Sequence, residues 1–337
     1  MKSINIRSFA KVNIALDVLD KRPDGYHNIE SVVQTISLHD CVTIARRDDG
    51  QISVRTSDPA VPSGEGNLAY RACVMFLEAA GQSVGVDIMI EKAIPMQAGL
   101  GGGSSNAAAA VRGLNDLFGR PLDEAGLHRI CAGVGSDAPL FLVGGTVFVS
   151  GRGEIVEPLP NVLLDYVIVK PDVGVSTAWA YGSLELRVES LERPHPSPLL
   201  KGEGGFSPSP QPSPKGEGDS APQAPASAAG YRSNGRRFAS RAVAEAVRGG
   251  NRQDVVRNMR NDFQEVVEAE FAEIAEIRGE MAGLGAENAM LAGSGSAVFG
   301  VFMDAGVCDA AYEVLKGKYQ RVYRAISVQN LTADERR

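Results

Sequence analysis

The stretch Gly99-Leu-Gly-Gly-Gly-Ser-Ser105 decides the fold. It follows the alternating segment from Val84 to Glu91, which predicts a strand, and it leads directly into Asn106-Ala-Ala-Ala-Ala110, which predicts a helix. Ser104 and Ser105 are residue types that cap helices, so we expect the helix to begin at them. A strand, a glycine loop and a helix therefore follow one another in a single unit.

This loop has the composition of a phosphate-binding loop. Glycine adopts positive φ readily, and consecutive backbone N–H groups in such a turn form a concave site for anions. The N-terminus of the following helix adds partial positive charge, and Ser104 and Ser105 offer hydroxyls to phosphate or Mg²⁺. The alternative is a plain glycine connector with a serine cap. Three adjacent glycines cost conformational entropy in a mere connector, so the composition favours phosphate.

Two common nucleotide-binding patterns do not fit. A P-loop requires lysine after its glycines, and none follows here. The dinucleotide pattern is matched loosely by Gly133-Val-Gly-Ser-Asp-Ala138, but Pro139 follows at once and the preceding segment is predicted to be helical. A nicotinamide-dependent oxidoreductase is therefore disfavoured.

Bulk properties limit the remaining classes. The chain has 337 residues, enough for two domains, and its net charge of −7 argues against a nucleic-acid partner. The four cysteines are scattered, so neither disulfides nor a zinc site are expected. The N-terminus alternates like a strand, and no apolar run is long enough to span a bilayer. We expect a cytoplasmic protein without a membrane partner.

The order of the segments predicts an α+β protein. Residues 3–57 are β-rich, and a helix is expected from Asn67 to Gly81 and another over 123–132. Further strands are expected over 145–149, 166–170, 297–303 and 322–327, with helices over 265–281 and 305–318. We expect two domains, 1–155 and 156–330.

Residues 193–235 differ from the rest of the chain. Pro, Gly, Ser and Ala dominate, and Pro212-Ser-Pro-Lys-Gly-Glu-Gly218 echoes the segment 197–204. Such a composition cannot bury enough apolar surface to offset its ordering entropy, so a disordered insertion is expected. A proline-rich docking ligand is the alternative, although this many prolines produce PxxP spacings by chance.

Five separated strings together resemble the GHMP kinase superfamily. They are Ala10-Lys-Val-Asn-Ile-Ala-Leu16, Arg22-Pro-Asp-Gly-Tyr-His27, Pro95-Met-Gln-Ala-Gly-Leu-Gly-Gly-Gly-Ser-Ser-Asn-Ala107, Gly135-Ser-Asp-Ala-Pro139 and Leu291-Ala-Gly-Ser-Gly-Ser296. The Gly-Tyr-His block resembles that of the branch that phosphorylates a cytidine diphosphate-linked methylerythritol for isoprenoid synthesis. The resemblance covers residues 3–328 except the insertion.

The resemblance implies a fold and an ATP site. The N-terminal domain would resemble domain 2 of ribosomal protein S5, and the C-terminal domain would be ferredoxin-like. ATP, with Mg²⁺, would contact Pro95, Met96, Gln97, Ala98, Gly99, Leu100, Gly101, Gly102, Gly103, Ser104 and Ser105. Gln97 and Ala98 stand where many members have glycine, which would stiffen the loop.

The resemblance also implies roles at the acceptor end. Asp137 would accept the proton of the substrate's 2-hydroxyl, and Lys11 would stabilise charge beside it. On the residues alone, Asp137 could be a turn aspartate and Lys11 a solvated strand charge. Tyr26 and Tyr181 would stack on the cytosine, and His27 would hydrogen-bond to it. Asn13 and Thr177 complete the implied substrate site, although Tyr181 could be a core helix residue.

Three rivals remain. A kinase of the same superfamily for homoserine, mevalonate or a sugar would share the loop but would not need the Gly-Tyr-His block. A non-catalytic regulator on this fold would be expected to lack Lys11 or Asp137, and both are present. An oxidoreductase is the third. The sequence leaves the choice between a monomer and a homodimer open.

Overall fold

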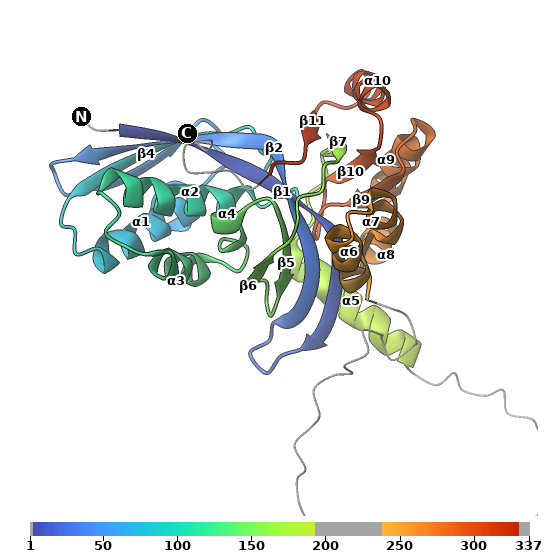
Figure 1. The fold of residues 1–337 in the computed structure, drawn as a ribbon, viewed down its shortest axis with the longest axis horizontal. Coiled ribbons are helices and arrows are strands. Elements are labelled where there is room, and N and C mark those ends of the chain that lie inside the picture. Colours follow the sequence, from blue (N-terminus) through green and yellow to red (C-terminus); the bar gives the residue numbers. More distant parts are fainter. Residues whose placement is uncertain (1–2, 193–237, 330–337) are drawn as a thin grey trace, which may run out of the picture.

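The computed structural model describes residues 3–192 and 238–329. Its longest feature is an antiparallel hairpin of β1 (Ser3–Lys21) and β2 (His27–Arg47), which runs between the two halves of the molecule (Figure 1). The short alternating stretches in the sequence are parts of these two strands. The register shifts between Phe9 and Ala10 and between Asn13 and Ala15, and such bulges interrupt the period-2 pattern.

The hairpin is the centre of a mixed sheet. In the described part of the chain the strand order is β3-β4-β2-β1-β8, and β5 and β6 extend the sheet from β2. The strands besides the hairpin are β3 (Ile52–Thr56), β4 (Gly85–Glu91), β5 (Thr146–Ser150), β6 (Ile155–Pro158) and β8 (Arg260–Asn261).

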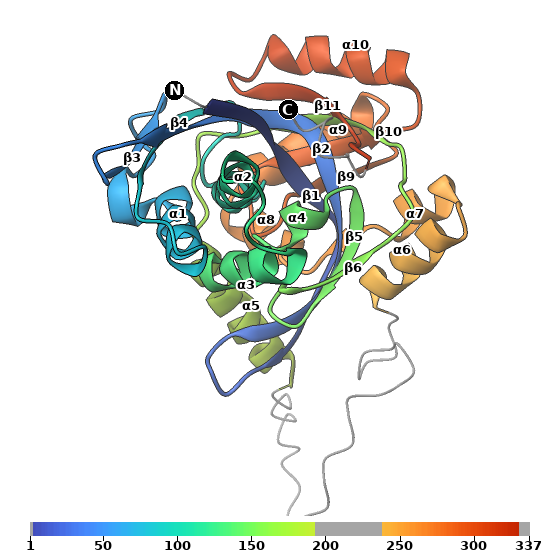
Figure 2. The same cartoon turned by 60° about the vertical axis from the view of Figure 1, so that its left-hand side comes forward.

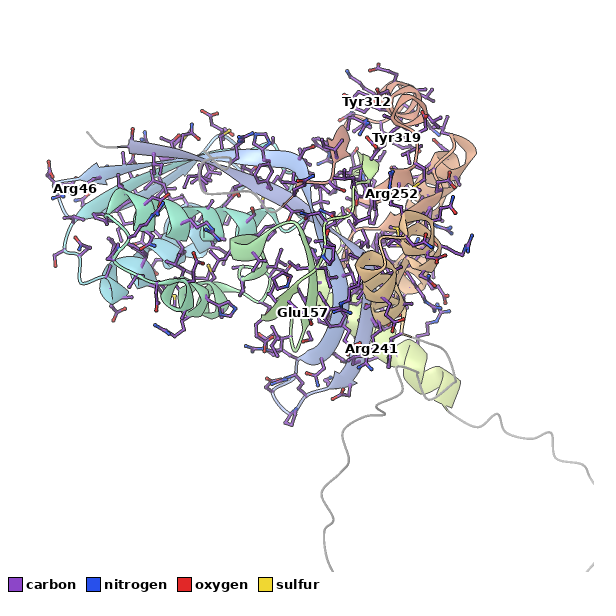
Figure 3. The ribbon with its side chains drawn as sticks, viewed as in Figure 1. Arg46, Glu157, Arg241, Arg252, Tyr312 and Tyr319 are labelled. Carbon is purple, nitrogen blue, oxygen red and sulfur yellow. The ribbon has the colours of Figure 1, made fainter. Side chains whose placement is uncertain are left out.

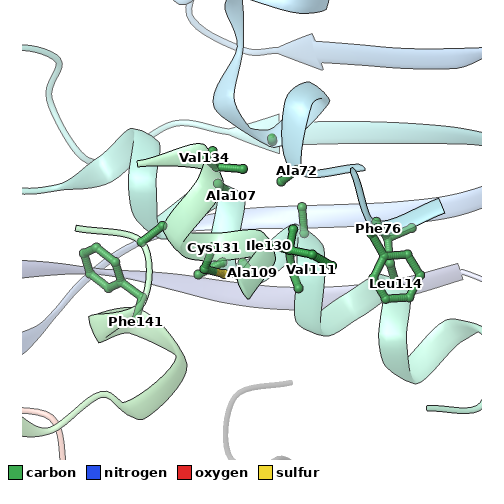
Figure 4. Close-up of a cluster of buried hydrophobic side chains, with 14 of the residues drawn as sticks. Ala72, Phe76, Ala107, Ala109, Val111, Leu114, Ile130, Cys131, Val134 and Phe141 are labelled. Carbon is green, nitrogen blue, oxygen red and sulfur yellow. The ribbon is translucent and has the colours of Figure 1, made fainter. Parts of the chain in front are cut away.

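Four helices cover one face of this sheet (Figure 1): α1 (Leu68–Ala79), α2 (Gly102–Leu117), α3 (Glu124–Val134) and α4 (Leu140–Val143). Asn67 caps α1 by accepting from Ala69 N (2.9 Å), which confirms the predicted start. The alanines from Ala107 to Ala110 are buried, and their small size lets α1 and α3 approach α2 closely (Figure 4).

The second sheet is antiparallel, with the order β11-β7-β10-β9. α5, α9 and α10 pack around it and the hairpin (Figure 2). The new elements are β7 (Asp165–Val169), β9 (Asn288–Leu291), β10 (Val298–Phe302), β11 (Val322–Ile326), α5 (Thr177–Glu192), α9 (Ala272–Gly283) and α10 (Ala305–Lys316). The predicted α+β class is confirmed. The division near residue 155 stays a prediction, because β6 still pairs in the first sheet and β8 joins β1 in parallel.

Two secondary-structure predictions were wrong. The single helix expected over 265–281 is two helices, α8 (Gln264–Glu270) and α9. Phe271 leaves the helical conformation between them (φ −120°, ψ 84°), and its ring packs edge-on against Trp179. The serines do not cap α2, because Gly101 in the left-handed conformation is the N-cap.

The helices α6 (Ala239–Arg248) and α7 (Arg252–Asn258) were not predicted. The buried Asp17 carboxylate of β1 accepts from Ser240 N (2.7 Å), which holds the first turn of α6 against the hairpin. Arg241 of α6 (Figure 3) donates two hydrogen bonds from its guanidinium group to the Glu30 carboxylate of β2. The chain therefore returns to the hairpin after residues 193–237. The predicted insertion falls within that gap, outside the described residues.

Candidate active site

The glycine loop lies between β4 and α2 and borders a cavity of about 350 Å³. Every residue from Pro95 to Ser104 lines this cavity, whereas Ser105, the last residue predicted to contact ATP, does not. Gly99 and Gly101 both have φ of +74°. A Cβ on Gly99 would lie 1.8 Å from the carbonyl oxygen of Ala292, so only glycine fits there.

The C-terminal loop from Leu291 to Ser296 supports the glycine loop. Ser296 N donates to Gln97 O and Ala297 N donates to Ala98 O, both at 3.3 Å. Gln97 and Ala98, which depart from the usual glycines, thus use their carbonyl groups for this contact. The glycine loop and the C-terminal loop, which are far apart in the chain, are therefore joined by direct backbone hydrogen bonds.

The two serines differ in position. Ser104 lines the cavity, and its hydroxyl makes no hydrogen bond to any residue that the structure describes. Ser105 is buried: its hydroxyl donates to Phe9 O (2.6 Å) and accepts from Ser8 Oγ (2.8 Å). Its backbone N–H donates to Gly101 O within the helix. The expected phosphate contact of Ser105 therefore has no free group to make it.

Sequence reasoning missed seven residues that line this cavity: Val61, Pro62, Gly66, Asn67, Leu68, Lys92 and Asn106. Lys92 pairs with Asp40, which is fully buried and also accepts from Ala93 N (2.7 Å) and Ile94 N (2.8 Å). Asp40 thereby fixes the chain that enters the loop. The position of Lys92 directly before the loop was the available signal, but Asp40 lies 52 residues earlier and gave none.

Lys11 and Asp137 meet beside the loop, as the resemblance implied. The Lys11 Nζ lies 3.8 Å from an Asp137 carboxylate oxygen and donates to Gly99 O (2.8 Å). Lys11 is buried, whereas the Asp137 side chain is 42% exposed. Burial lowers the pKa of Lys11, and the charge and hydrogen bond of Asp137 oppose that shift. The carboxylate therefore favours the charged form of the amine.

Asn13 lies behind this pair. Its Oδ1 accepts from Lys11 Nζ (2.7 Å), and its Nδ2 donates to Ser31 Oγ (2.9 Å). It is buried and lines neither this cavity nor the second one described below. Asn13 thus holds Lys11 in place.

A second cavity, of about 610 Å³, opens on the other side of Asp137. The predicted substrate residues Tyr26, His27, Thr177 and Tyr181 all line it. Tyr26 and His27 stand at the turn of the hairpin, and Thr177 and Tyr181 lie in the first turns of α5. Strands and a helix from distant parts of the chain therefore converge on one carboxylate.

The rings in this cavity are arranged differently from the expected sandwich. The His27 and Tyr181 rings stack on each other (centroids 5.0 Å apart, 19° between planes), and Phe263 packs edge-on against Tyr181. Burial raises the pKa of Tyr181 to about 12. Tyr26 is 57% exposed and lies beneath the Arg152 guanidinium.

Three further charged residues line this cavity and were missed: Lys21, Arg152 and Glu185. The Glu185 carboxylate accepts from Lys21 Nζ (2.9 Å) and lies 3.3 Å from His27 Nε2. The hydrogen bond from Lys21 is the main cause that lowers the pKa of Glu185. The charges of Glu185 and Lys21 thus neutralise each other beside the His27 ring.

Comparison with known proteins shows which family has this arrangement. Residues 67–145 match the family model for the GHMP kinases N terminal domain, and residues 243–321 match the model for GHMP kinases C terminal. The 4-diphosphocytidyl-2-C-methyl-D-erythritol kinase of Acetivibrio thermocellus is 37% identical over 94% of this chain and 96% of its own. The protein of the same name from Alkaliphilus oremlandii is 34% identical, over 96% of each chain. The chain belongs to the 4-diphosphocytidyl-2-C-methyl-D-erythritol kinase family.

Solved structures agree with this family. The crystal structure of 4-(cytidine 5'-diphospho)-2C-methyl-D-erythritol kinase aligns with a TM-score of 0.69 and 29% identity, covering 96% of this chain and 100% of that one. Homoserine kinase from Cytophaga hutchinsonii aligns with a TM-score of 0.68, covering 98% of this chain and 96% of its own. Because its sequence is only 17% identical, this likeness shows the fold alone. The two-domain GHMP kinase fold is confirmed. None of the described helices is both long enough and apolar enough to cross a bilayer.

Proposed function

We propose that this chain transfers the γ-phosphoryl group of ATP to the 2-hydroxyl of 4-diphosphocytidyl-2-C-methyl-D-erythritol, in the non-mevalonate route to isoprenoid precursors. One observation carries the proposal. Asp137 borders the aromatic cavity while its partner Lys11 contacts the glycine loop, so the pair lies where an acceptor and a phosphate chain would meet. Phosphoryl transfer depends mostly on such positioning and on charge stabilisation.

Asp137 takes the role of base in this proposal. Its carboxylate accepts the proton of the substrate hydroxyl as the oxygen attacks phosphorus. Lys11 stabilises negative charge on the group in transfer, and it does so in a buried setting where a charge acts strongly. Asn13, which we expected to bind substrate, is assigned instead to orienting the Lys11 amine.

The ATP phosphates lie along residues 95–104, where backbone N–H groups at the start of α2 and the Ser104 hydroxyl are available. Ser105 is not assigned to the phosphate site, because its hydroxyl and its backbone N–H both donate to other carbonyl groups. Lys92 joins it as a cation at the cavity wall.

Mg²⁺ would come with the nucleotide. The described residues contain no cluster of three or more His, Cys, Asp or Glu side chains that could hold a metal. Phosphate oxygens and water supply most ligands of a nucleotide-bound Mg²⁺, so a site with few protein ligands fits it. Ser104 Oγ, which makes no hydrogen bond to a described residue, would be a protein ligand of the ion, and the ion would neutralise phosphate charge.

The cytosine lies in the aromatic cavity, bordered by Tyr26, His27 and Tyr181, with Thr177 at its edge. Thr177 Oγ1 and Ser294 Oγ lie 3.0 Å apart, which ties this wall to the loop that braces the glycines. A homoserine or mevalonate kinase would share the ATP site but has no use for the aromatic cavity. We further propose a cytoplasmic monomer or homodimer whose N-terminal domain, 1–155, binds ATP and whose domain 156–330 completes the substrate site.

The test is ATP turnover with 4-diphosphocytidyl-2-C-methyl-D-erythritol as acceptor, and with homoserine and mevalonate as controls. We expect turnover with the first acceptor alone. Folded protein that binds ATP but phosphorylates homoserine or mevalonate instead would contradict the substrate assignment while leaving the kinase assignment in place.

A further inference from the structure

Arg152 stands in the tight turn between β5 and β6, on the wall of the aromatic cavity. The turn is well anchored: Gly153 N donates to Ser150 O (3.1 Å), and Gly151 O accepts from Ile29 N of β2 (2.8 Å). Arg152 N itself donates to the Glu154 carboxylate (2.6 Å). The backbone that carries this arginine is therefore fixed relative to the hairpin.

The guanidinium group lies over the Tyr26 ring, 5.1 Å from its centroid. A cation over a tyrosine face is attracted to it, so the contact favours this position for the charge. On the other side of the turn, a Cβ on Gly153 would lie 3.7 Å from Asp137 Oδ1. The turn thus spans from the aromatic wall to the carboxylate that faces the acceptor.

Charge is balanced at the other cations of this site but not at Arg152. Lys21 pairs with Glu185, and Lys11 pairs with Asp137. Arg152 has no ion pair with any residue that the structure describes. Asp24 interacts electrostatically with Arg152, but its carboxylate is hydrogen-bonded to Arg22 and to Tyr26 N. A guanidinium with its hydrogen bonds unused suits a ligand with two adjacent anionic groups.

We propose that Arg152 binds the diphosphate of the substrate, between the base at Tyr26 and the hydroxyl at Asp137. This inference rests on the proposed function, since only a cytidine diphosphate-linked acceptor has a diphosphate at that point. Arg152 selects a nucleoside diphosphate over a bare nucleoside, while the rings select the base. The planar fork of arginine can donate to oxygens of both phosphates, which lysine cannot match.

The test compares the binding of CDP and of cytidine by calorimetry, with saturating ADP present so that the glycine loop is occupied. The variant is Arg152→Gln, and the matched control is Arg46→Gln. Arg46 is an exposed arginine on the far end of β2 (Figure 3), so its replacement removes the same charge without touching the cavity.

We expect Arg152→Gln to weaken CDP binding about 10- to 100-fold, as for the loss of hydrogen bonds to a charged group, and to leave cytidine binding within about threefold. The KM for the diphosphate-linked substrate should rise similarly, with the KM for ATP unchanged. Equal losses for CDP and cytidine would overturn the inference, because Arg152 would then only support Tyr26. Wild-type protein that binds neither ligand would instead refute the proposed function itself.

Discussion

Replacing Asp137 with asparagine separates catalysis from folding at this site. The substitution keeps the shape of the side chain but removes the charge that lies 3.8 Å from Lys11 Nζ. Without a base for the hydroxyl proton, turnover should fall by about 10²- to 10⁴-fold. ATP binding should persist, because the glycine loop makes no contact that needs the Asp137 charge.

The stability change follows from Coulomb's law. At 3.8 Å the attraction is about 4 kcal/mol at an effective dielectric constant of about 20 and about 1 kcal/mol in bulk water. Because the Asp137 side chain is 42% exposed, solvent screens the pair and the lower figure applies. We expect the variant to lose about 1 kcal/mol of unfolding free energy at pH 7.

This loss should depend on pH with a definite sign. Burial already lowers the pKa of folded Lys11 below its ordinary value of 10.5, and removing Asp137 lowers it further. The unfolded chain then binds more protons than the folded chain over a wider range below pH 10.5, so the stability of the variant rises with pH across that range. The difference in unfolding free energy between the variant and the wild type should therefore shrink as the pH approaches 10.5, the ordinary pKa of lysine.

Three measurements check this reasoning: release of ADP, ATP binding by calorimetry, and urea unfolding at pH 7 and near pH 10. Asp48→Asn is the matched control, since the exposed Arg46–Asp48 pair is also 3.8 Å apart and should matter little. The reasoning would be refuted by turnover above about a tenth of wild type, given the expected 10²-fold loss, or by a stability deficit that does not change with pH.

Other substitutions test the supports of the site. Gly99→Ala, whose Cβ would overlap Ala292 O, should lower the free energy of unfolding in urea by at least about 3 kcal/mol. Gly279→Ala, an unobstructed site within α9, should raise it by about 1 kcal/mol. Equal effects of the two substitutions would contradict the close approach at Gly99. Asp40→Ala leaves Lys92 buried without its partner and should cost about 3–5 kcal/mol, and a loss below about 1 kcal/mol would show the pair to be dispensable. Tyr181→Ala should raise the KM for the cytidine-linked substrate by the equivalent of about 1–3 kcal/mol of lost stacking, with the KM for ATP as the internal control.

Local patterns predicted those parts of the molecule that local interactions determine. Asn67 caps α1 as expected, because the cap bond joins residues two apart in the chain. The helix break at Phe271 escaped prediction, because it depends on packing against Trp179, far away in the sequence. Ser105 was misassigned for a similar reason: its partners Ser8 and Phe9 come from β1.

The candidate site was predictable only to the extent that its residues stand in recognisable strings. The resemblance supplied Lys11, Asp137, Tyr26 and His27, and all four lie in or beside the two cavities. No sequence pattern pointed to Asp40, Glu185 or Arg152, since charged residues outside a string resemble ordinary surface residues until the fold brings them together.

The hairpin of β1 and β2 explains how these separate strings make one site. Lys11 lies in the middle of β1 and contacts the glycine loop. Tyr26 and His27 lie at the turn of the hairpin, where they line the aromatic cavity. Because the two strands are paired along nearly their whole length, with bulges between Asn13 and Ala15 and between Val18 and Lys21, the distance between the phosphate end and the base end is set by one long hairpin. α6 reinforces the hairpin from outside through Asp17 and Glu30. In the proposed complex this hairpin sets the distance between the reacting hydroxyl and the cytosine of the same substrate, which is what a kinase for a long, nucleotide-linked acceptor requires.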